Sequence, residues 1–345
     1  MDLTIASILG LDGITSGAIY ALVAIALVLV FAVTRIVFIP QGEFVAFGAL
    51  TMALFQTGKV PGTVWLLMLM ATVATLMDVA QAVRDRWAPA RMLREGTRNF
   101  VLPMGVALVA MWVAPMQPPL LVQAALTLAL VTPMGPLVYR LAFRSLADSS
   151  SLVLLIVAVG VHFALTGLGL LFFGAEGFRN PPFWDERFTL GALAVTGQTL
   201  IIFAASLVLI VALFVFFDHT LSGKALRATS VNRTGARLMG ISTDGAGYLS
   251  FTMASFIGTL SGLLIGPSTT IYYDSGFLIG LKGFVAAVFA GLTSFPLALL
   301  GAVGVGLLES FGSFWASSFK EVIVFTAILP VLLWRSFVDR HHEEH

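Results

Sequence analysis

The chain has 345 residues, of which 58% are hydrophobic and only 11% are charged, with a mean hydropathy of +0.98 and a net charge of +1. A soluble domain carries about 25% charged residues, so this composition excludes a water-soluble globular protein and predicts an all-α, polytopic membrane protein. Cysteine is absent, which excludes disulfides, thiolate metal sites and a cysteine nucleophile. The small net charge gives no indication of nucleic-acid binding, and no nucleic-acid partner is expected.

Apolar runs follow one another along nearly the whole chain. Each helical crossing needs about 20 mostly apolar residues, so there is room for about eight to eleven membrane segments in one transmembrane bundle. The first run has no Lys or Arg before Arg35 and is therefore expected to stay as a transmembrane helix instead of being cleaved as a signal peptide. The runs lie at residues 11–33, 40–56, 63–80, 100–116, 119–139, 151–173, 197–217, 247–268, 277–292, 296–316 and 319–335.

The second and ninth of these runs are short, are interrupted by glycines, and contain Glu43 and Lys282. Each run is therefore either a tilted crossing or a re-entrant half-helix that lines a cavity. Gln41, Gly42 and Glu43 follow a proline, at a break where freed backbone groups and a carboxylate could face a polar pathway.

Charged residues inside membrane segments are costly and are therefore candidates for function. Glu43 either lines the polar pathway or compensates a helix dipole, and Lys282 either lines the pathway or extends its ammonium to the outer interface. Glu309 has no cation near it in the sequence, and either lines the pathway or pairs with another helix. His162 has no Ser, Asp or Glu beside it, so hydrogen-bonded packing is favoured over a proton relay, and an intramembrane enzyme is disfavoured.

Lys and Arg are concentrated in a few places, which sets the expected orientation. Positive charge favours the cytoplasmic side, whereas loop 174–189, with acidic residues and prolines, suits the outer side. Eleven crossings that start outside would place every basic set in the cytoplasm. The tail, residues 341–345, would then be cytosolic, and a solvated terminus is favoured there over a metal site despite its three histidines. The basic sets are loop 78–99, Arg140 with Arg144, loop 218–247 and Arg335.

Small residues recur at four-residue spacing, which lets helix backbones approach closely in lipid. For any single pair, ordinary packing within the chain is favoured over a dimer contact or a moving interface. The glycines are Gly13 and Gly17; Gly258, Gly262 and Gly266; and Gly276 and Gly280.

Residues 218–247, here called the basic loop, are polar between two apolar runs and are too long for a simple reversal of direction. The pattern predicts two short helices outside the membrane. The first starts at Ser222 and stops near Thr229 and Ser230. The second runs from Arg233 to Met239, capped by Asn232 and closed by Gly240.

Each predicted helix of the basic loop carries a small apolar contact face. Leu226 lies on the first helix, and Leu238 and Met239 lie on the second. Such a pair of helices suits docking into a groove of a partner protein. The alternative is an amphipathic loop that lies on anionic lipid.

Several stretches of the chain carry a common pattern when they are taken together. They are Gly17–Leu22, Gly42–Phe44, Thr220–Ala228, Ala236–Ile241 and Leu281–Val288, followed by Gly291-Leu292 and Ser294-Phe295-Pro296. This pattern resembles the permease of ABC importers of the branched-chain amino acid type. The resemblance covers roughly 1–56 and 137–335, whereas 57–116 fits poorly and is interpreted as an insertion with extra hydrophobic segments. Pro40-Gln41 also stands where the family often has Ala-His.

The resemblance implies that residues 1–340 form one permease domain in the bacterial inner membrane and contribute half of a pore. It implies ATP-driven uptake of branched-chain or hydrophobic amino acids, or of a related small polar solute. The implied partners are cytosolic ATPase subunits, a sister permease and a periplasmic solute-binding protein. The basic loop would be the coupling loop, with Lys224, Leu226, Arg227, Ala236, Leu238, Met239 and Gly240 as coupling residues; Gln41, Gly42, Glu43, Lys282 and Glu309 would line the pathway.

The chain itself has no ATP-binding motif. No Gly-x-x-x-x-Gly-Lys-Ser/Thr occurs, and Gly223-Lys224-Ala225 lacks both the upstream glycine and the hydroxyl. No cofactor and no enzymatic activity are therefore expected in this subunit, and ATP would be bound by its partners. The alternative is a self-sufficient secondary transporter or channel, although no convincing repeat relates the two halves.

Overall fold

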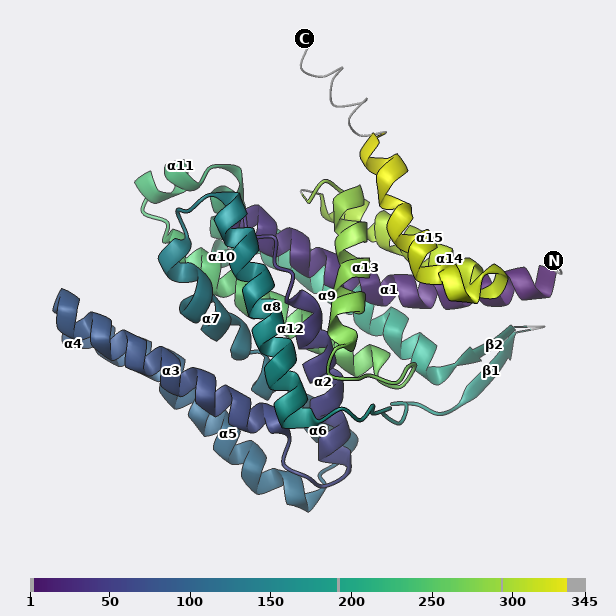
Figure 1. The fold of residues 1–345 in the computed structure, drawn as a ribbon, viewed down its shortest axis with the longest axis horizontal. Coiled ribbons are helices and arrows are strands. Elements are labelled where there is room, and N and C mark those ends of the chain that lie inside the picture. Colours follow the sequence, from purple (N-terminus) through teal and green to yellow (C-terminus); the bar gives the residue numbers. More distant parts are fainter. Residues whose placement is uncertain (1–2, 191–192, 293, 334–345) are drawn as a thin grey trace, which may run out of the picture.

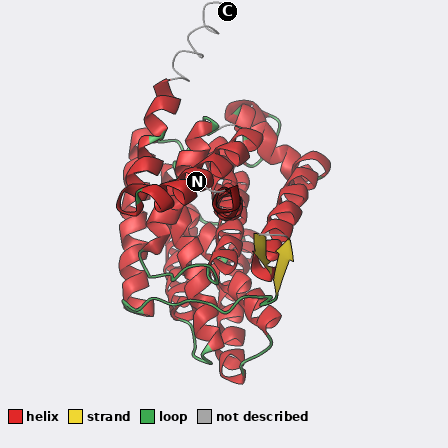
Figure 2. Ribbon diagram, turned by 90° about the vertical axis from the view of Figure 1, so that its right-hand side faces the viewer, coloured by secondary structure: helices red, strands yellow, loops and turns green. Residues whose placement is uncertain are grey.

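The computed structural model describes residues 3–190, 193–292 and 294–333, and most of them lie in helices (Figures 1 and 2). In these ranges, eight helical segments are long and apolar enough to cross a membrane, which places the fold within the expected class. The eight segments are α1 (Leu3–Thr34), α3 (Gly62–Asp85), the continuous stretch Pro89–Met116, the stretch Leu120–Leu146, α8 (Ser151–Phe173), α9 (Gly197–His219), α12 (Thr243–Ile265) and α14 (Phe295–Trp315).

Two of these segments are built from several helical pieces. Pro89–Met116 consists of α4 (Pro89–Gly96), a π-helical turn η1 (Thr97–Val101), α5 (Leu102–Val113) and η2 (Ala114–Met116). Leu120–Leu146 consists of α6 (Leu120–Val131), α7 (Met134–Val138), a second π-helical turn η3 (Tyr139–Phe143) and η4 (Arg144–Leu146).

Shorter elements complete the fold. They are α2 (Gln41–Gln56), α10 (Leu221–Val231), α11 (Arg233–Leu238), α13 (Ser275–Phe289), η5 (Ser317–Phe319), α15 (Lys320–Thr326), and the strands β1 (Arg187–Leu190) and β2 (Leu193–Thr196), which pair antiparallel.

Helix α1 is the most enclosed of the spanning segments, since 89% of its most apolar stretch is buried, and it packs along α14, α12 and α13. Its glycines make the contact with α14 possible. A Cβ added at Gly13 would lie 2.9 Å from the Cα of Leu307, and one at Gly17 would lie 2.8 Å from the Cα of Val303. These glycines therefore serve packing within the chain, as expected.

Helices α2 and α13 are half-helices that meet at their N-terminal ends. With 16 and 15 residues they are about 24 and 22 Å long, shorter than the roughly 30 Å hydrocarbon core of a bilayer. A Cβ added at Gly42 would lie 1.8 Å from the carbonyl oxygen of Gly276, so the two backbones touch. Gln41 donates a 2.9 Å hydrogen bond to the carbonyl of Ala254, halfway along α12, which places this crossing in the middle of the bundle.

The chain reaches this crossing through an irregular segment between α1 and α2. Ile36 and Phe38 of this segment are buried, and the Phe38 ring packs against Phe251 of α12 with 4.7 Å between centroids. Irregular backbone at membrane depth is tolerated where protein covers it. The segment therefore carries the chain from the end of α1 back into the bundle.

The basic loops gather at one end of the bundle, here called the basic end. Arg237 of α11 pairs with Asp148 of the loop before α8 at 3.2 Å, and Arg144 pairs with Asp244 at the start of α12 at 2.9 Å. Figure 1 shows α4 and α11 toward the left and the β1–β2 hairpin toward the right. This agrees with the expectation that one side carries the positive charge. Arg335 and the tail 341–345 lie outside the described residues.

We expect Gly42→Ala to destabilise the fold by more than about 3 kcal/mol, because the new Cβ would collide with backbone atoms that no side-chain rotation can move. The midpoint of thermal unfolding in detergent measures this effect. Gly304→Ala is the matched control, since a Cβ at Gly304 meets nothing within 4 Å. Equal midpoints for the two variants would contradict the close crossing of α2 and α13.

Candidate functional site

The basic loop folds as two capped helices at the basic end. Thr220 begins α10, because its Oγ1 accepts a 3.0 Å hydrogen bond from the backbone N–H of Gly223. The helix therefore starts one residue before Ser222 and continues one residue past Ser230, to Val231, which corrects the predicted bounds. Thr229 is accommodated since its hydroxyl donates to the carbonyl of Ala225 at 2.8 Å.

The second helix of the basic loop begins at the expected Arg233 and ends at Leu238, one residue before the expected Met239. The Oδ1 of Asn232 accepts a 2.8 Å hydrogen bond from the N–H of Gly235, as an N-cap requires. Gly240 has a φ of 80°, the left-handed conformation that ends a helix without steric cost. The cap and the closing glycine of α11 are thus confirmed.

Two predicted coupling residues are buried in the chain itself. Leu226 is 1% exposed and clusters with Leu29 and Val33 of α1 and Ala246 of α12, and Ala236 is also buried. The expectation that Leu226 offers an exposed contact face is therefore wrong. The apolar side chain of α10 turns inward because the ends of α1 and α12 supply apolar surface beneath it.

Arginine side chains connect the second helix of the basic loop to the segment before α8 and to α12. Arg233 donates to the carbonyl of Ala147 at 3.0 Å, and Arg237 donates to the hydroxyl of Thr243 at 2.9 Å in addition to its pair with Asp148. Buried Leu226 and these arginines together fix the basic loop to α1, α12 and the segment before α8. A displacement of the loop is therefore expected to move those elements with it.

The outer face of the basic loop exposes large apolar side chains. Leu238 is 84% exposed and Met239 is 82% exposed, and Leu221 and Val231 are similarly exposed. A concavity of about 460 Å³ lies between α10 and α11, and Lys224, Arg227, Gly235 and Met239 are among the residues that line it. Contiguous exposed apolar surface is typical of sites that contact another molecule.

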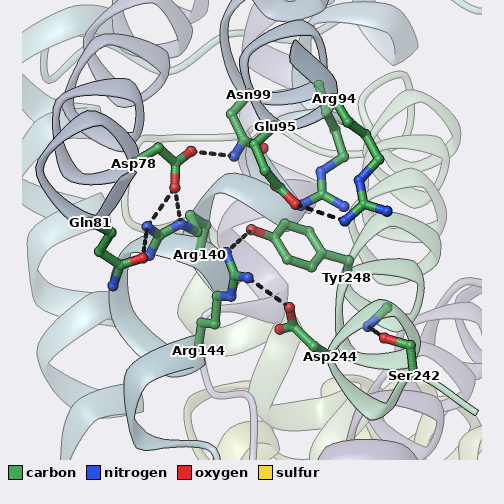
Figure 3. Close-up of polar contacts among 12 residues, drawn as sticks. Asp78, Gln81, Arg94, Glu95, Asn99, Arg140, Arg144, Ser242, Asp244 and Tyr248 are labelled. Carbon is green, nitrogen blue, oxygen red and sulfur yellow. Dashed lines mark hydrogen bonds and ion pairs between the residues drawn. The ribbon is translucent and has the colours of Figure 1, made fainter. Parts of the chain in front are cut away.

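Beneath the basic end lies a buried polar network that sequence reasoning missed (Figure 3). The carboxylate of Asp78 on α3 accepts from Arg140 on η3 at 2.6 Å and from the side-chain amide of Asn99 on η1 at 2.7 Å. Arg140 also donates to Gln81 at 2.8 Å. The sequence did contain one indication of this network. Asp78 is the one carboxylate in the apolar run 63–80, and a charge inside a membrane segment is expected to have a partner.

The network continues to the start of α12. The guanidinium of Arg98 lies over the ring of Tyr248, 3.7 Å from its centroid, and also pairs with the buried Glu95. Arg144 donates to the hydroxyl of Tyr248 at 3.4 Å and pairs with Asp244. Asn99 and Arg140 both lie in π-helical turns, which occur frequently at functional sites. The network links α3, η1 and η3 to α12.

The predicted pathway residues Gln41, Gly42 and Glu43 lie together at the half-helix crossing. Glu43 is buried, and its Oε1 lies 2.7 Å from Nδ1 of His162, midway along α8. His162 thus has a hydrogen-bond partner, as its expected packing role requires, whereas the expectation that no acidic side chain pairs with it is wrong, because the partner comes from a distant part of the chain. Glu43 Oε2 and Gln41 Oε1 accept no hydrogen bond within the described ranges.

The other two predicted pathway residues form a second cluster. Lys282 of α13 is buried, pairs with Glu309 of α14 at 2.5 Å, and pairs with Glu321 of α15 at 3.2 Å. Tyr20 of α1 donates its hydroxyl hydrogen to Glu309 at 2.5 Å. Lys282 is therefore enclosed among carboxylates, and Glu309 pairs with another helix, one of the two alternatives expected for it. In the described ranges, no three His, Asp or Glu side chains gather as a metal site needs.

The comparisons with known proteins identify the family. The family model described as "Branched-chain amino acid transport system / permease component" matches residues 98–333, more than half of the chain. The chain belongs to this family. The matched range includes the basic loop, α12, α13 and α14. It begins inside the segment 57–116, whose interpretation as an insertion stays a prediction.

Several curated relatives are similar to the chain. LivH of Escherichia coli (strain K12), a high-affinity branched-chain amino acid transport system permease protein, is 28% identical over 201 residues, which are 56% of this chain and 65% of LivH. BraD of Pseudomonas aeruginosa is 27% identical over 226 residues, 63% of this chain and 74% of BraD. The chain thus matches slightly less than two thirds of the length of LivH.

More distant matches exist. LsrC of Yersinia enterocolitica, an autoinducer 2 import system permease protein, is 28% identical over 133 residues, 38% of this chain and 35% of LsrC. The solved structure of PsaBC from Streptococcus pneumoniae in complex with Fab has a TM-score of 0.43 at 11% identity, with 93% of this chain and 89% of that chain covered.

We expect Asp78→Ala to lower the free energy of unfolding by about 3–5 kcal/mol, because it leaves the buried guanidinium of Arg140 without its carboxylate. Asp85→Ala, on the same helix, is the control and should change stability by less than about 0.5 kcal/mol, since its pair with Arg84 is exposed. Thermal unfolding in detergent compares the two. A double variant, Asp78→Leu with Arg140→Met, should recover part of the loss; no recovery would contradict the pairing.

A double-mutant cycle tests the pair of Glu43 and His162. Glu43→Leu and His162→Leu should each destabilise the protein, and the double variant should cost less than their sum by about 0.5–3 kcal/mol, because the two side chains are in contact. His219 lies at the far end of α9, so a cycle between Glu43 and His219 serves as the control. Additive effects in both cycles would contradict the contact.

Proposed function

We propose that the chain is the membrane-spanning permease subunit of an ABC importer, which forms half of a pore and is driven by separate cytosolic ATPase subunits. The one observation that carries this proposal is the outer face of the basic loop, where Leu238 and Met239 are exposed on a helix that is capped and anchored. A loop that only reversed the chain direction would need neither the anchoring nor the exposed apolar side chains.

The anchoring of the basic loop suggests how movement would pass into the membrane. A push on α10 would act on α1 and α12 through Leu226, and a push on α11 would act on α12 through the bond from Arg237 to Thr243. Packed helices transmit displacement because their interiors are dense. Since α12 packs against α2, displacement of α12 would reach the half-helix crossing.

The half-helix crossing is the proposed gate of the translocation pathway. Gln41 and Glu43 each have one side-chain oxygen without a hydrogen-bond partner among the described residues, and both lie where two helix N-termini meet. Unpaired polar atoms at membrane depth are costly and suit a place where a polar solute passes. Lys282 and Glu309, which already pair with each other, are proposed to hold the neighbouring helices in place along the same pathway.

The names of the relatives suggest the kind of solute and the partners. LivH and BraD are named for branched-chain amino acids and LsrC for autoinducer 2, so the proposed substrate is a branched-chain or other hydrophobic amino acid, or a related small polar solute. A sister permease, a periplasmic solute-binding protein and the bacterial inner membrane complete the proposed system.

A self-sufficient secondary transporter is the second candidate. The pairs of Glu43 with His162 and of Lys282 with Glu309 favour it, because buried titratable pairs beside broken helices are typical of ion-coupled transporters. Uptake into vesicles separates the two functions. Accumulation of solute against its gradient without ATPase subunits would refute the importer.

We expect Leu238→Asp to lower the stimulated ATPase rate at least ten-fold when the chain is co-expressed with its ATPase subunits, because a charge replaces an apolar contact at the docking face. Leu93→Asp is the control, since Leu93 is 74% exposed on α4, also at the basic end but outside the basic loop. Co-purification of the subunits reports whether docking itself is lost. Unchanged assembly and stimulation in Leu238→Asp would contradict the docking role.

A further inference from the structure

A deep apolar groove lies where the basic loop meets the membrane helices. Its cavity has a volume of about 480 Å³, within the range of about 300–1,000 Å³ typical of sites that bind small molecules. Four helices form its walls. Leu29 and Val33 belong to α1, Leu213 and Phe217 to α9, Leu226 to α10 and Leu299 to α14.

The groove opens toward a surface that contacts hydrocarbon. Helix α9 has a mean hydropathy of 3.2, and only 17% of its most apolar stretch is buried. Its large side chains Leu207, Val211 and Phe214 are exposed, and Phe214 also lines the groove. The apolar wall of the groove is therefore continuous with the exposed apolar side of α9, a surface of the kind that contacts lipid in a membrane-spanning helix.

Positive charge surrounds the polar mouth of the groove. Arg227 and Ser230 of α10 line the mouth, and Arg35 donates to the carbonyl of Ser230 at 3.5 Å. The carboxylate that faces this group among the described residues is Asp218, 3.5 Å from Arg227. Two guanidinium groups against one carboxylate leave the mouth net positive, at the end of the bundle that the positive-inside rule assigns to the cytoplasmic leaflet.

We propose that this groove binds one anionic phospholipid of the cytoplasmic leaflet, with an acyl chain between α1, α9 and α14 and the phosphate between Arg35 and Arg227. The apolar walls match the chain, and the two guanidinium groups match a phosphate, which accepts hydrogen bonds from arginine in a forked geometry. The bound lipid would contact the basic loop and three membrane helices at once. It would therefore tie α10 to the bundle.

Native mass spectrometry of the purified full-length chain tests the proposal. The protein is equilibrated with vesicles of phosphatidylglycerol or of phosphatidylcholine, and the fraction that retains lipid is measured. We expect several-fold greater retention of phosphatidylglycerol, and Arg35→Gln and Arg227→Gln should each reduce this preference about five-fold, since one arginine near an anionic headgroup contributes about that factor. Arg187→Gln, at the opposite end on β1, is the matched control and should leave the preference unchanged.

Groove-filling variants test the acyl-chain site separately from the charge. Ala32→Phe and Ile210→Phe both place a ring in the groove and should lower retention of both lipids, and having two variants guards against one that fails to fold. Equal retention of the two lipids by the unaltered chain would overturn the proposal. So would a groove-filling variant that separates a dimer into monomers and leaves lipid retention intact, because a second copy would then occupy the groove.

Discussion

The arrangement of the bundle depends on one constraint, the contact of two backbones in its middle. Helices α2 and α13 meet at Gly42 and Gly276, where neither position has room for a single additional carbon atom. Because both helices end there, their N-terminal N–H groups point into the same region, and Gln41 and Glu43 come with them. Helix α12 packs closely against the same region, since Gly258 and Gly262 leave room for the side chain of Phe44 and the backbone of Val45 on α2.

The polar groups of the chain are divided between two levels of the bundle. The half-helix crossing holds Glu43 with His162, whereas the basic end holds the network around Asp78, Arg140 and Tyr248. Helix α12 connects the two levels, because Tyr248 lies near its start and Ala254, which accepts from Gln41, lies at its midpoint. A helix with one end at the proposed docking surface and its centre at the proposed gate would link the two mechanically.

Sequence reasoning located nearly every helix, because hydropathy and loop charge depend on local composition. It also located the N-cap Asn232 and the closing Gly240, whose roles are set by neighbouring residues. It did not find the partner of His162, which lies 119 residues away along the chain, or the burial of Leu226. Both depend on which helices pack together, and one sequence without its relatives carries no information on such distant pairs.

The buried pair of Asp78 and Arg140 has a consequence for how the protein can change over generations. The segment 57–116 contributes Asp78, and the stretch Leu120–Leu146 contributes Arg140, so each part holds one half of a charge-neutral unit. Losing either half alone strands a charge away from water. Once both residues were present, a substitution of either one alone would have destabilised the protein. Related chains that contain both parts are therefore expected to keep or change these two positions together.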